Sequence, residues 1–123
     1  MAYLNPRIYD NGLTVLSSEA NALHICTTEP TTYTEAVTTY TIGNKASPII
    51  AAPTDRTGGG REVVVSAISD GSVTAAGTPN FVAIVDTVNL RLLMTGALTT
   101  TEAMLNGDTF TINQFAIGIP LPA

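Results

Sequence analysis

Two segments of the chain carry apolar side chains at spacings of three and four residues. The first set is Leu13, Leu16 and Ala20, and the second is Tyr33, Val37 and Tyr40. Such spacing places side chains on one face of a helix. We therefore expect a short helix near the N-terminus and one or two helical turns around residue 37. Gly43-Asn44 is expected to end the second helical segment.

Elsewhere apolar positions alternate with polar ones or form short continuous runs, which predicts strands. The expected strands are residues 22–27, 62–68, 72–76, 81–86, 89–95 and 109–119. Asp70-Gly71 is a strong hairpin dipeptide and is expected to join the second and third strands. In the first strand, Leu23 and Ile25 belong to one face, and His24 and Cys26 belong to the other. The run 81–85 is apolar on both faces, which predicts a central, covered strand.

The last apolar segment changes its pattern halfway. The apolar positions are Phe110 and Ile112, then Phe115, Ile117 and Ile119. Strand side chains have a period of two, so one face takes both sets only if a residue is inserted. We predict a bulge or bend at Asn113-Gln114. Short strands with frequent turn signals indicate a mainly β fold, a single antiparallel β-sandwich or barrel domain (1–123) with a short N-terminal helix.

Three segments lack a strand pattern. Residues 47–60 contain Pro48, Pro53 and three consecutive glycines, and are the most loop-like part of the chain. We expect this loop and the arm formed by residues 1–6 to contact a partner, because such segments commonly become ordered on binding. Residues 99–105 are expected to form a helical turn.

The composition points to association more than to catalysis. Hydrophobic residues make up 45% of the chain and charged residues only 12%, and there is no Trp. Thr, with 20 of 123 positions, takes the place of charged residues and suits exposed strands. A surface with so little charge does not keep neighbouring molecules apart, which suits a protein that packs against others.

Net charge and hydropathy limit the classes of binding partner and the cellular location that we expect for the protein. The formal net charge is −5, and five Lys and Arg residues are spread along the chain without a basic stripe. We therefore expect no direct nucleic-acid binding. No apolar run reaches the ~20 residues of a membrane span, so no membrane partner is expected. The first residues lack the layout of a signal peptide, and the protein is expected to remain in the cytoplasm in which it is made.

The sequence contains no recognisable catalytic, cofactor-binding or metal-binding motif, and we expect no enzyme activity. His24 is the only histidine and Cys26 the only cysteine, and both lie within a predicted strand. We expect His24 to be a hydrogen-bonded or surface residue and Cys26 a small buried hydrophobe. The ten acidic residues are scattered among turn residues, as expected for groups that bond local backbone amides. The glycines at 58–60 are followed by Arg61-Glu62, not by the Lys and Ser or Thr of a phosphate-binding loop.

Five stretches of sequence together resemble small virion proteins of tailed bacteriophages, of the head decoration or capsid cement type. They are MAYLNPRIY at residues 1–9, ICTTEPTTY at 25–33, GNK at 43–45, AIVDTVNLRLL at 83–93 and GDTFTI at 107–112. The resemblance covers nearly the whole chain and carries no catalytic signature. It implies a structural virion protein that binds the major capsid protein, stabilises the head shell and self-associates, with a trimer favoured.

Two other classes of structural role fit the residues. A tail, neck or fibre component of the virion would share the low charge, the Thr content and the β structure. A small β-sandwich binding module, for example for carbohydrate, would have the same fold. Such modules usually present Trp or clustered Tyr to sugars, and this chain has no Trp.

Overall fold

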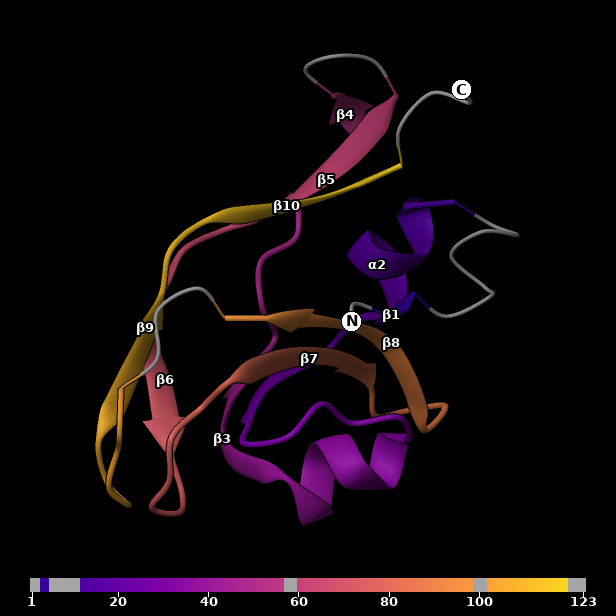
Figure 1. Ribbon diagram of the computed structural model, residues 1–123. Coiled ribbons are helices and arrows are strands. Elements are labelled where there is room, and N and C mark those ends of the chain that lie inside the picture. Colours follow the sequence, from indigo (N-terminus) through magenta and orange to yellow (C-terminus); the bar gives the residue numbers. More distant parts are fainter. Residues whose placement is uncertain (1–2, 5–11, 57–59, 99–101, 120–123) are drawn as a thin grey trace.

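The protein is an antiparallel, sandwich-like β fold, as the sequence predicts. The computed structural model describes residues 3–4, 12–56, 60–98 and 102–119. Seven strands form one sheet in the order β1-β8-β7-β2-β3-β6-β9, and three form a second sheet in the order β10-β5-β4. Every strand pair within these sheets is antiparallel. The sheets pack against each other without closing into a barrel (Figure 1).

The described helices and strands follow one another along the chain. They are β1 (Tyr3–Leu4), α2 (Thr14–Glu19), β2 (Ala22–Cys26), the π-helix η1 (Glu35–Thr39), β3 (Thr41–Ala46), β4 (Thr54–Asp55), β5 (Arg61–Val65), β6 (Ile68–Val73), β7 (Phe81–Asp86), β8 (Arg91–Ala97), β9 (Thr109–Ile112) and β10 (Phe115–Ile119). Both predicted helical segments are present, as α2 and η1.

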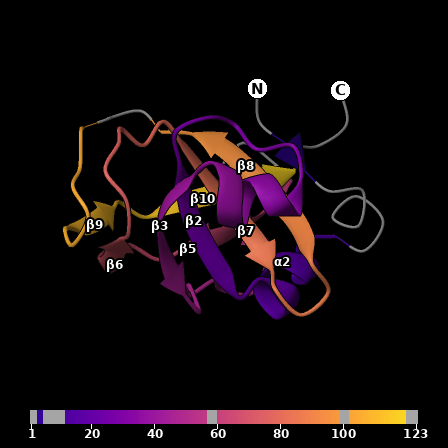
Figure 2. The ribbon, with the colours of Figure 1, turned by 90° about the horizontal axis from the view of Figure 1, so that it is seen from below.

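The large sheet is covered on both faces. Figures 1 and 2 show η1 across one face, and α2 and the small sheet on the other. The larger core cluster lies between the two sheets and α2, and includes Leu16, Leu23, Ile84, Val63 and Ile117. A smaller cluster lies under η1 and consists of Ala22, Cys26, Ala36, Ala83, Val85 and Leu92.

Strands β2 and β7 form the middle of the large sheet and supply side chains to both clusters. In β2, Leu23 and Ile25 join the larger cluster whereas Cys26 joins the smaller one, which confirms the predicted faces. Strand β7 pairs with β2 on one side and with β8 on the other, and five of its six residues are buried. The prediction that 81–85 is a central, covered strand is confirmed.

The chain crosses from one sheet to the other at Asn113-Gln114, where a bulge or bend was predicted. Strand β9 ends at Ile112 and pairs with β6 of the large sheet, whereas β10 begins at Phe115 and pairs with β5 of the small one. Phe110 and Ile117 are both buried because the change of pattern coincides with this crossing. A second crossing lies beside it, where residues 66–67 separate β5 from β6. The predicted single strand over 62–68 is therefore two strands in different sheets.

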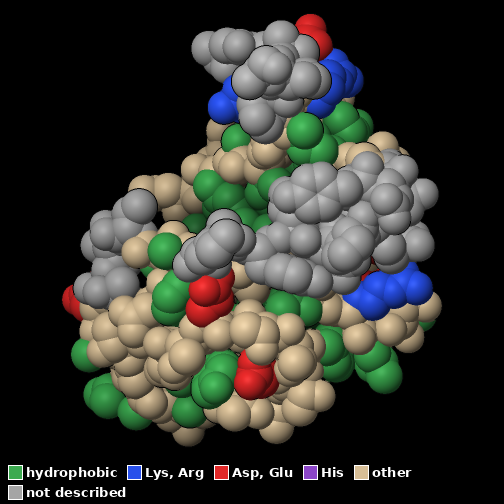
Figure 3. All heavy atoms as spheres, turned by 45° about the vertical axis from the view of Figure 1, so that its right-hand side comes forward, with side chains coloured by type: hydrophobic (Ala, Val, Ile, Leu, Met, Phe, Trp, Pro, Cys, Tyr) green, Lys and Arg blue, Asp and Glu red, His purple; other side chains and the backbone are tan. Residues whose placement is uncertain are grey.

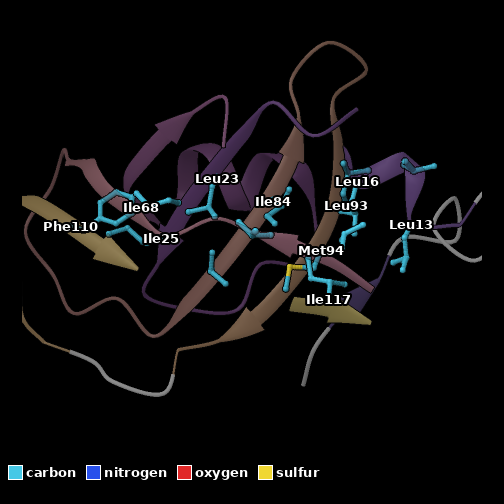
Figure 4. Packing of buried hydrophobic residues seen from close by; sticks show 14 of the residues in the cluster. Leu13, Leu16, Leu23, Ile25, Ile68, Ile84, Leu93, Met94, Phe110 and Ile117 are labelled. Atoms are coloured by element: carbon cyan, nitrogen blue, oxygen red, sulfur yellow. The ribbon is translucent and has the colours of Figure 1, made fainter. Parts of the chain in front are cut away.

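The predicted hairpin at Asp70-Gly71 is wrong, because both residues lie inside β6. Gly71 is paired directly with Phe110 of β9. A Cβ on Gly71 would lie 2.2 Å from the ring of Phe110, so glycine is needed here to make room for the ring. Figure 4 shows that ring beside Ile25 and Ile68. The glycine reflects close packing across a strand pair and not a turn.

Gly43-Asn44 does not end a helix either. Both residues lie within β3, and a Cβ on Gly43 would lie 2.6 Å from the backbone oxygen of Ser72 in β6. This glycine therefore permits close approach of two strands. The predicted helical turn over 99–105 falls partly outside the described residues. Within the described part, Met104 forms an isolated β-bridge with Gly77 instead.

Candidate functional site

His24 is buried in β2 and takes part in a local hydrogen-bond chain. Its Nδ1 lies 2.9 Å from Oγ1 of Thr41, and the Thr41 hydroxyl donates to the Gly43 carbonyl oxygen at 3.0 Å. Because the hydroxyl proton is used there, Thr41 Oγ1 accepts from Nδ1–H of His24. Burial lowers the pKa of His24, which favours the neutral ring. These contacts are those of a structural histidine, as the sequence predicts.

Cys26 is buried on the face of β2 that η1 covers. Its Sγ donates to the Ala36 carbonyl oxygen at 3.6 Å. Burial raises the pKa of the thiol to about 12, so the reactive thiolate is scarce at neutral pH. Cys26 is therefore a small packing residue in this fold.

The carboxylates of Glu35 and Asp108 accept hydrogen bonds from nearby backbone and hydroxyl groups. Glu35 accepts from the backbone N–H and the hydroxyl of Thr31 at 2.8 Å, and these bonds lower its pKa. Asp108 accepts from the backbone N–H of Leu105 at 2.9 Å. Among the described residues, no group of three or more His, Cys, Asp or Glu side chains could hold a metal ion. None of the helices described has the length and apolar character to cross a membrane.

The turn between β7 and β8, residues 87–90, is held by several polar contacts. One carboxylate oxygen of Asp86 accepts from the backbone N–H of Val88 and Asn89, at 2.9 and 3.2 Å. The other accepts from Nδ2 of Asn89 at 2.8 Å. Burial of Asp86 raises its pKa, but these hydrogen bonds and the charge of Arg91 outweigh burial, and the pKa is lowered overall. The ionised carboxylate of Asp86 thus stabilises the turn by accepting hydrogen bonds from its backbone and from the Asn89 side chain.

Contacts to the segment that includes α2 fix this turn from outside. The backbone N–H of Thr87 donates to Oδ1 of Asn21 at 2.9 Å. Arg91 forms an ion pair with Glu19 of α2, with 3.2 Å between Nη1 and Oε1. The position of the turn relative to the core is therefore set by a second element.

The same turn presents two large apolar side chains to solvent. Val88 is 79% exposed and Leu90 is 65% exposed. Leu90 also has a φ of +57°, in the left-handed region that a leucine adopts at a cost of about 1–2 kcal/mol. A polar residue at 88 and a glycine or asparagine at 90 would suit an isolated turn better. We refer to residues 87–90 as the apolar turn.

An open cavity of about 470 Å³ lies at the other end of the β7–β8 pair. Met94 and Leu98 come from β8 and the residue that follows it, and Phe110 and Phe115 come from β9 and β10. Met104 and Glu102 also line the cavity. Glu102 is the one charged side chain among the described lining residues. The cavity is mainly apolar, in the size range of binding pockets in proteins.

A third exposed apolar feature follows the outer side of β5. Ile50 bridges Val65, the backbone N–H of Ala51 donates to the Val64 oxygen at 3.0 Å, and β4 continues the pairing to Arg61. Residues 49–55 therefore form the margin of the small sheet. Ile49 is 71% exposed, and Ala51 and Ala52 are exposed beside it. We refer to residues 49–52 as the apolar margin.

Several charged groups of the described residues are paired with a charge of opposite sign. On the face in Figure 3, acidic and basic side chains are few, and at the top of the view an acidic side chain lies beside basic ones. Two of the ion pairs are exposed contacts between neighbouring strands and segments, Lys45–Asp70 at 3.1 Å and Arg61–Asp55 at 2.6 Å. Exposed pairs of this kind contribute about 0–1 kcal/mol each.

No protein-family model matches the chain, and neither does any curated protein or solved structure with which it was compared. The candidate surfaces therefore come from geometry alone. The loop predicted at residues 47–60 contains the apolar margin, whereas the arm predicted at residues 1–6 lies largely outside the described residues. Neither the apolar turn nor the cavity was predicted as a candidate functional surface. The signal for the turn was in the sequence, since Val88 and Leu90 alternate with polar residues just beyond a strand.

Proposed function

We propose that this protein is a structural component of a tailed-phage virion, a decoration or cement protein that binds the outside of the head and stabilises it. Its partner is the major capsid protein, and its site of action is the virion assembled in the bacterial cytoplasm. No catalytic step is part of this role. The sequence resemblance suggests the class of protein, a phage head decoration protein. The exposed apolar surface is the part of the molecule that could bind the head.

The observation that carries the proposal is the apolar margin. An exposed isoleucine followed by two exposed small residues lies along a strand-like segment that β5 holds in place. The segment falls within residues 47–60, the loop expected from its sequence to contact a partner. A pre-formed apolar strip loses little conformational entropy on docking.

The low charge supports the same role. The chain has only 15 formal charges, ten acidic and five basic. A cement protein needs interface area repeated over many copies more than it needs charged hot spots. An acidic balance also suits the outer surface of a particle, where attraction to DNA serves no purpose.

Binding to heads that lack the protein tests the apolar margin. Ile49→Asn should weaken co-sedimentation with such heads by about tenfold or more, because a central apolar contact becomes a buried polar group. Leu105→Asn is the matched control, since Leu105 is 67% exposed and lies elsewhere. The control should bind within about twofold of the wild type. Equal binding by both variants would exclude the apolar margin as the contact.

Stability of the particles tests the role itself. Heads without the protein should release their DNA at a lower temperature than heads with it, and adding purified protein should restore the difference. If the two kinds of head lose DNA at the same temperature, the protein is not a cement. Recovery of the protein with purified tails would instead favour a tail or neck component.

A further inference from the structure

The turn that precedes β9 carries an Asn-Gly pair on the surface of the protein. It consists of residues 105–108, and the backbone N–H of Asp108 donates to the Leu105 oxygen at 3.0 Å. Gly107 has a φ of +96°, so the positive φ falls on the third residue, as in a type II turn. Asn106, Gly107 and Asp108 are all exposed, and water therefore reaches the pair directly.

An asparagine followed by glycine has the arrangement through which a side-chain amide is lost. The backbone nitrogen of the second residue attacks Cγ of the asparagine and closes a succinimide ring. Glycine places no side chain in the way, and no heavy atom lies within 4 Å of the position that a Cβ of Gly107 would take. Bulkier residues follow two other asparagines of the chain, in Asn89-Leu90 and Asn113-Gln114.

The attacking nitrogen is restrained in the folded protein. The backbone N–H of Gly107 donates to the Val73 oxygen at 2.9 Å, and the N–H of Val73 donates to the Asp108 oxygen at 2.9 Å. Oδ2 of Asp108 accepts from the N–H of Leu105 at 2.9 Å, which closes the turn from its other side. The nitrogen must lose its proton to react, so the Gly107–Val73 bond has to open first. The rate in the folded protein is then the intrinsic rate multiplied by the fraction of open turns.

We propose that Asn106 is a site of spontaneous deamidation and that opening of the turn at residues 105–108 controls its rate. The Gly107 nitrogen gives its proton to hydroxide and forms a bond to Cγ of Asn106. The bond from Cγ to Nδ2 breaks, and Nδ2 takes up a proton from water and leaves as ammonia. Water then opens the succinimide at either carbonyl, which gives aspartate or isoaspartate. The net reaction consumes one water molecule, releases one ammonia molecule and requires no enzyme or oxidant.

Deamidation at this position changes the link between β6 and β9. Both products place a new negative charge beside Asp108, and isoaspartate also adds a methylene group to the backbone. A lengthened backbone no longer fits the bonds that join Gly107 and Asp108 to Val73. The change therefore loosens the β6–β9 pair close to the buried ring of Phe110. The inference goes beyond the proposed function, because it depends on this chain alone and holds whether or not the protein binds a phage head.

Peptide mapping of aged protein tests the site. The full-length wild type is kept for several weeks in mildly alkaline buffer, folded in one sample and unfolded in urea in another. Mass spectrometry with fragmentation then measures the acid formed at each asparagine. Asn106 should be converted in both samples, about tenfold or more slowly in the folded one because the turn is mostly closed. Asn89 and Asn113 should keep their amides over the same period.

Variants of Asp108 test control by the turn. Asp108→Ala removes the acceptor for the Leu105 N–H and keeps the Asn-Gly pair, so Asn106 should be converted several times faster in the folded protein and equally fast in urea. Asp108→Asn keeps an acceptor oxygen and should restore the slow rate. Asp55→Ala is the matched control, because it removes an exposed carboxylate from β4 of the other sheet. Its rate should stay within about twofold of the wild type.

Three results would overturn the inference. An unchanged Asn106 in the folded sample, once the sample in urea is fully converted, would exclude the site in the native protein. Equal rates in the folded and unfolded samples would exclude control by the turn, and so would an Asp108→Ala variant with the wild-type rate in both. Loss of head binding bears on the proposed function alone, since none of these measurements involves a phage head.

Discussion

His24 and Cys26 stand two residues apart in β2, and burial determines the chemistry of both. A neutral imidazole that donates to Thr41 and a thiol that donates to Ala36 are satisfied without solvent. Buried polar groups with partners stabilise one arrangement of neighbouring elements, here η1 and β3 against β2. Both residues contribute to packing.

Cys26 should be unreactive in the folded protein. With a thiol pKa of about 12, almost no thiolate is present at pH 7.5. A chromogenic disulfide reagent should therefore leave native protein unmodified for hours and react completely after unfolding in guanidinium chloride. Labelling of the native protein within minutes, at the rate of a free peptide thiol, would contradict this account of the site.

His24 should make the protein less stable as the pH falls below the ordinary histidine pKa of 6.5. Its folded-state pKa is lowered, so the unfolded chain binds the proton first, and the free energy of unfolding falls as the pH drops from 6.5 to the folded-state pKa. One proton limits this slope to about 1.4 kcal/mol per pH unit. Urea unfolding of the wild type and of His24→Gln at several pH values measures it. The variant should lose the slope between pH 6.5 and 5.5, and an identical slope in both proteins would exclude His24 as its origin.

At the scale of elements, close approach of strands determines several positions that look like turns in the sequence. Gly71 lies under the ring of Phe110, and Gly43 lies against the backbone of Ser72. Both glycines therefore belong to the interior of the large sheet. Their function is to leave space, which a local sequence pattern does not distinguish from a turn.

Gly71→Ala should destabilise the protein by about 1–3 kcal/mol, because the added Cβ collides with the Phe110 ring. Phe110→Leu removes the ring atoms nearest to that Cβ and should relieve part of the collision. The double variant should therefore be more stable than the sum of the two single effects predicts, by about 0.5 kcal/mol or more. Urea midpoints of the four proteins measure the coupling. Strictly additive effects would show that Gly71 and Phe110 are not in the predicted contact.

The fold class, the two helical segments and the faces of β2 were all predictable from apolar spacing. The change of pattern at Asn113-Gln114 predicted a bulge or bend, and the chain there passes from one sheet to the other. The crossing at residues 66–67 was missed, although the buried positions change there from odd (Val63, Val65) to even (Ile68), just as they change from even to odd at Asn113-Gln114. Residues 62–68 are divided into two strands because their two parts pair in different sheets, and not because of the conformational preferences of the residues themselves.

The candidate surfaces were only partly predictable. The loop at residues 47–60 was expected to contact a partner, but its pairing with β5 depends on long-range contacts that composition does not encode. The cavity brings together residues from β8 to β10 and from the segment around Met104. Such a site arises only from the topology, in which the seventh strand of one sheet continues into the first strand of the other.

At the scale of the whole molecule, three apolar features lie on different parts of a weakly charged surface. The apolar margin follows β5, the apolar turn caps the β7–β8 pair, and the cavity lies at the other end of that pair. Their separation allows the apolar margin to be altered without changing the turn or the cavity.

The number of copies per virion tests the proposed function most directly. Quantitative mass spectrometry of purified virions gives this number relative to the major capsid protein. A decoration protein that occupies symmetric positions over the whole head should be present in hundreds of copies, in a fixed ratio to the capsid protein and on isolated heads without tails. About a dozen copies or fewer, recovered with tails or necks, would contradict the head decoration role.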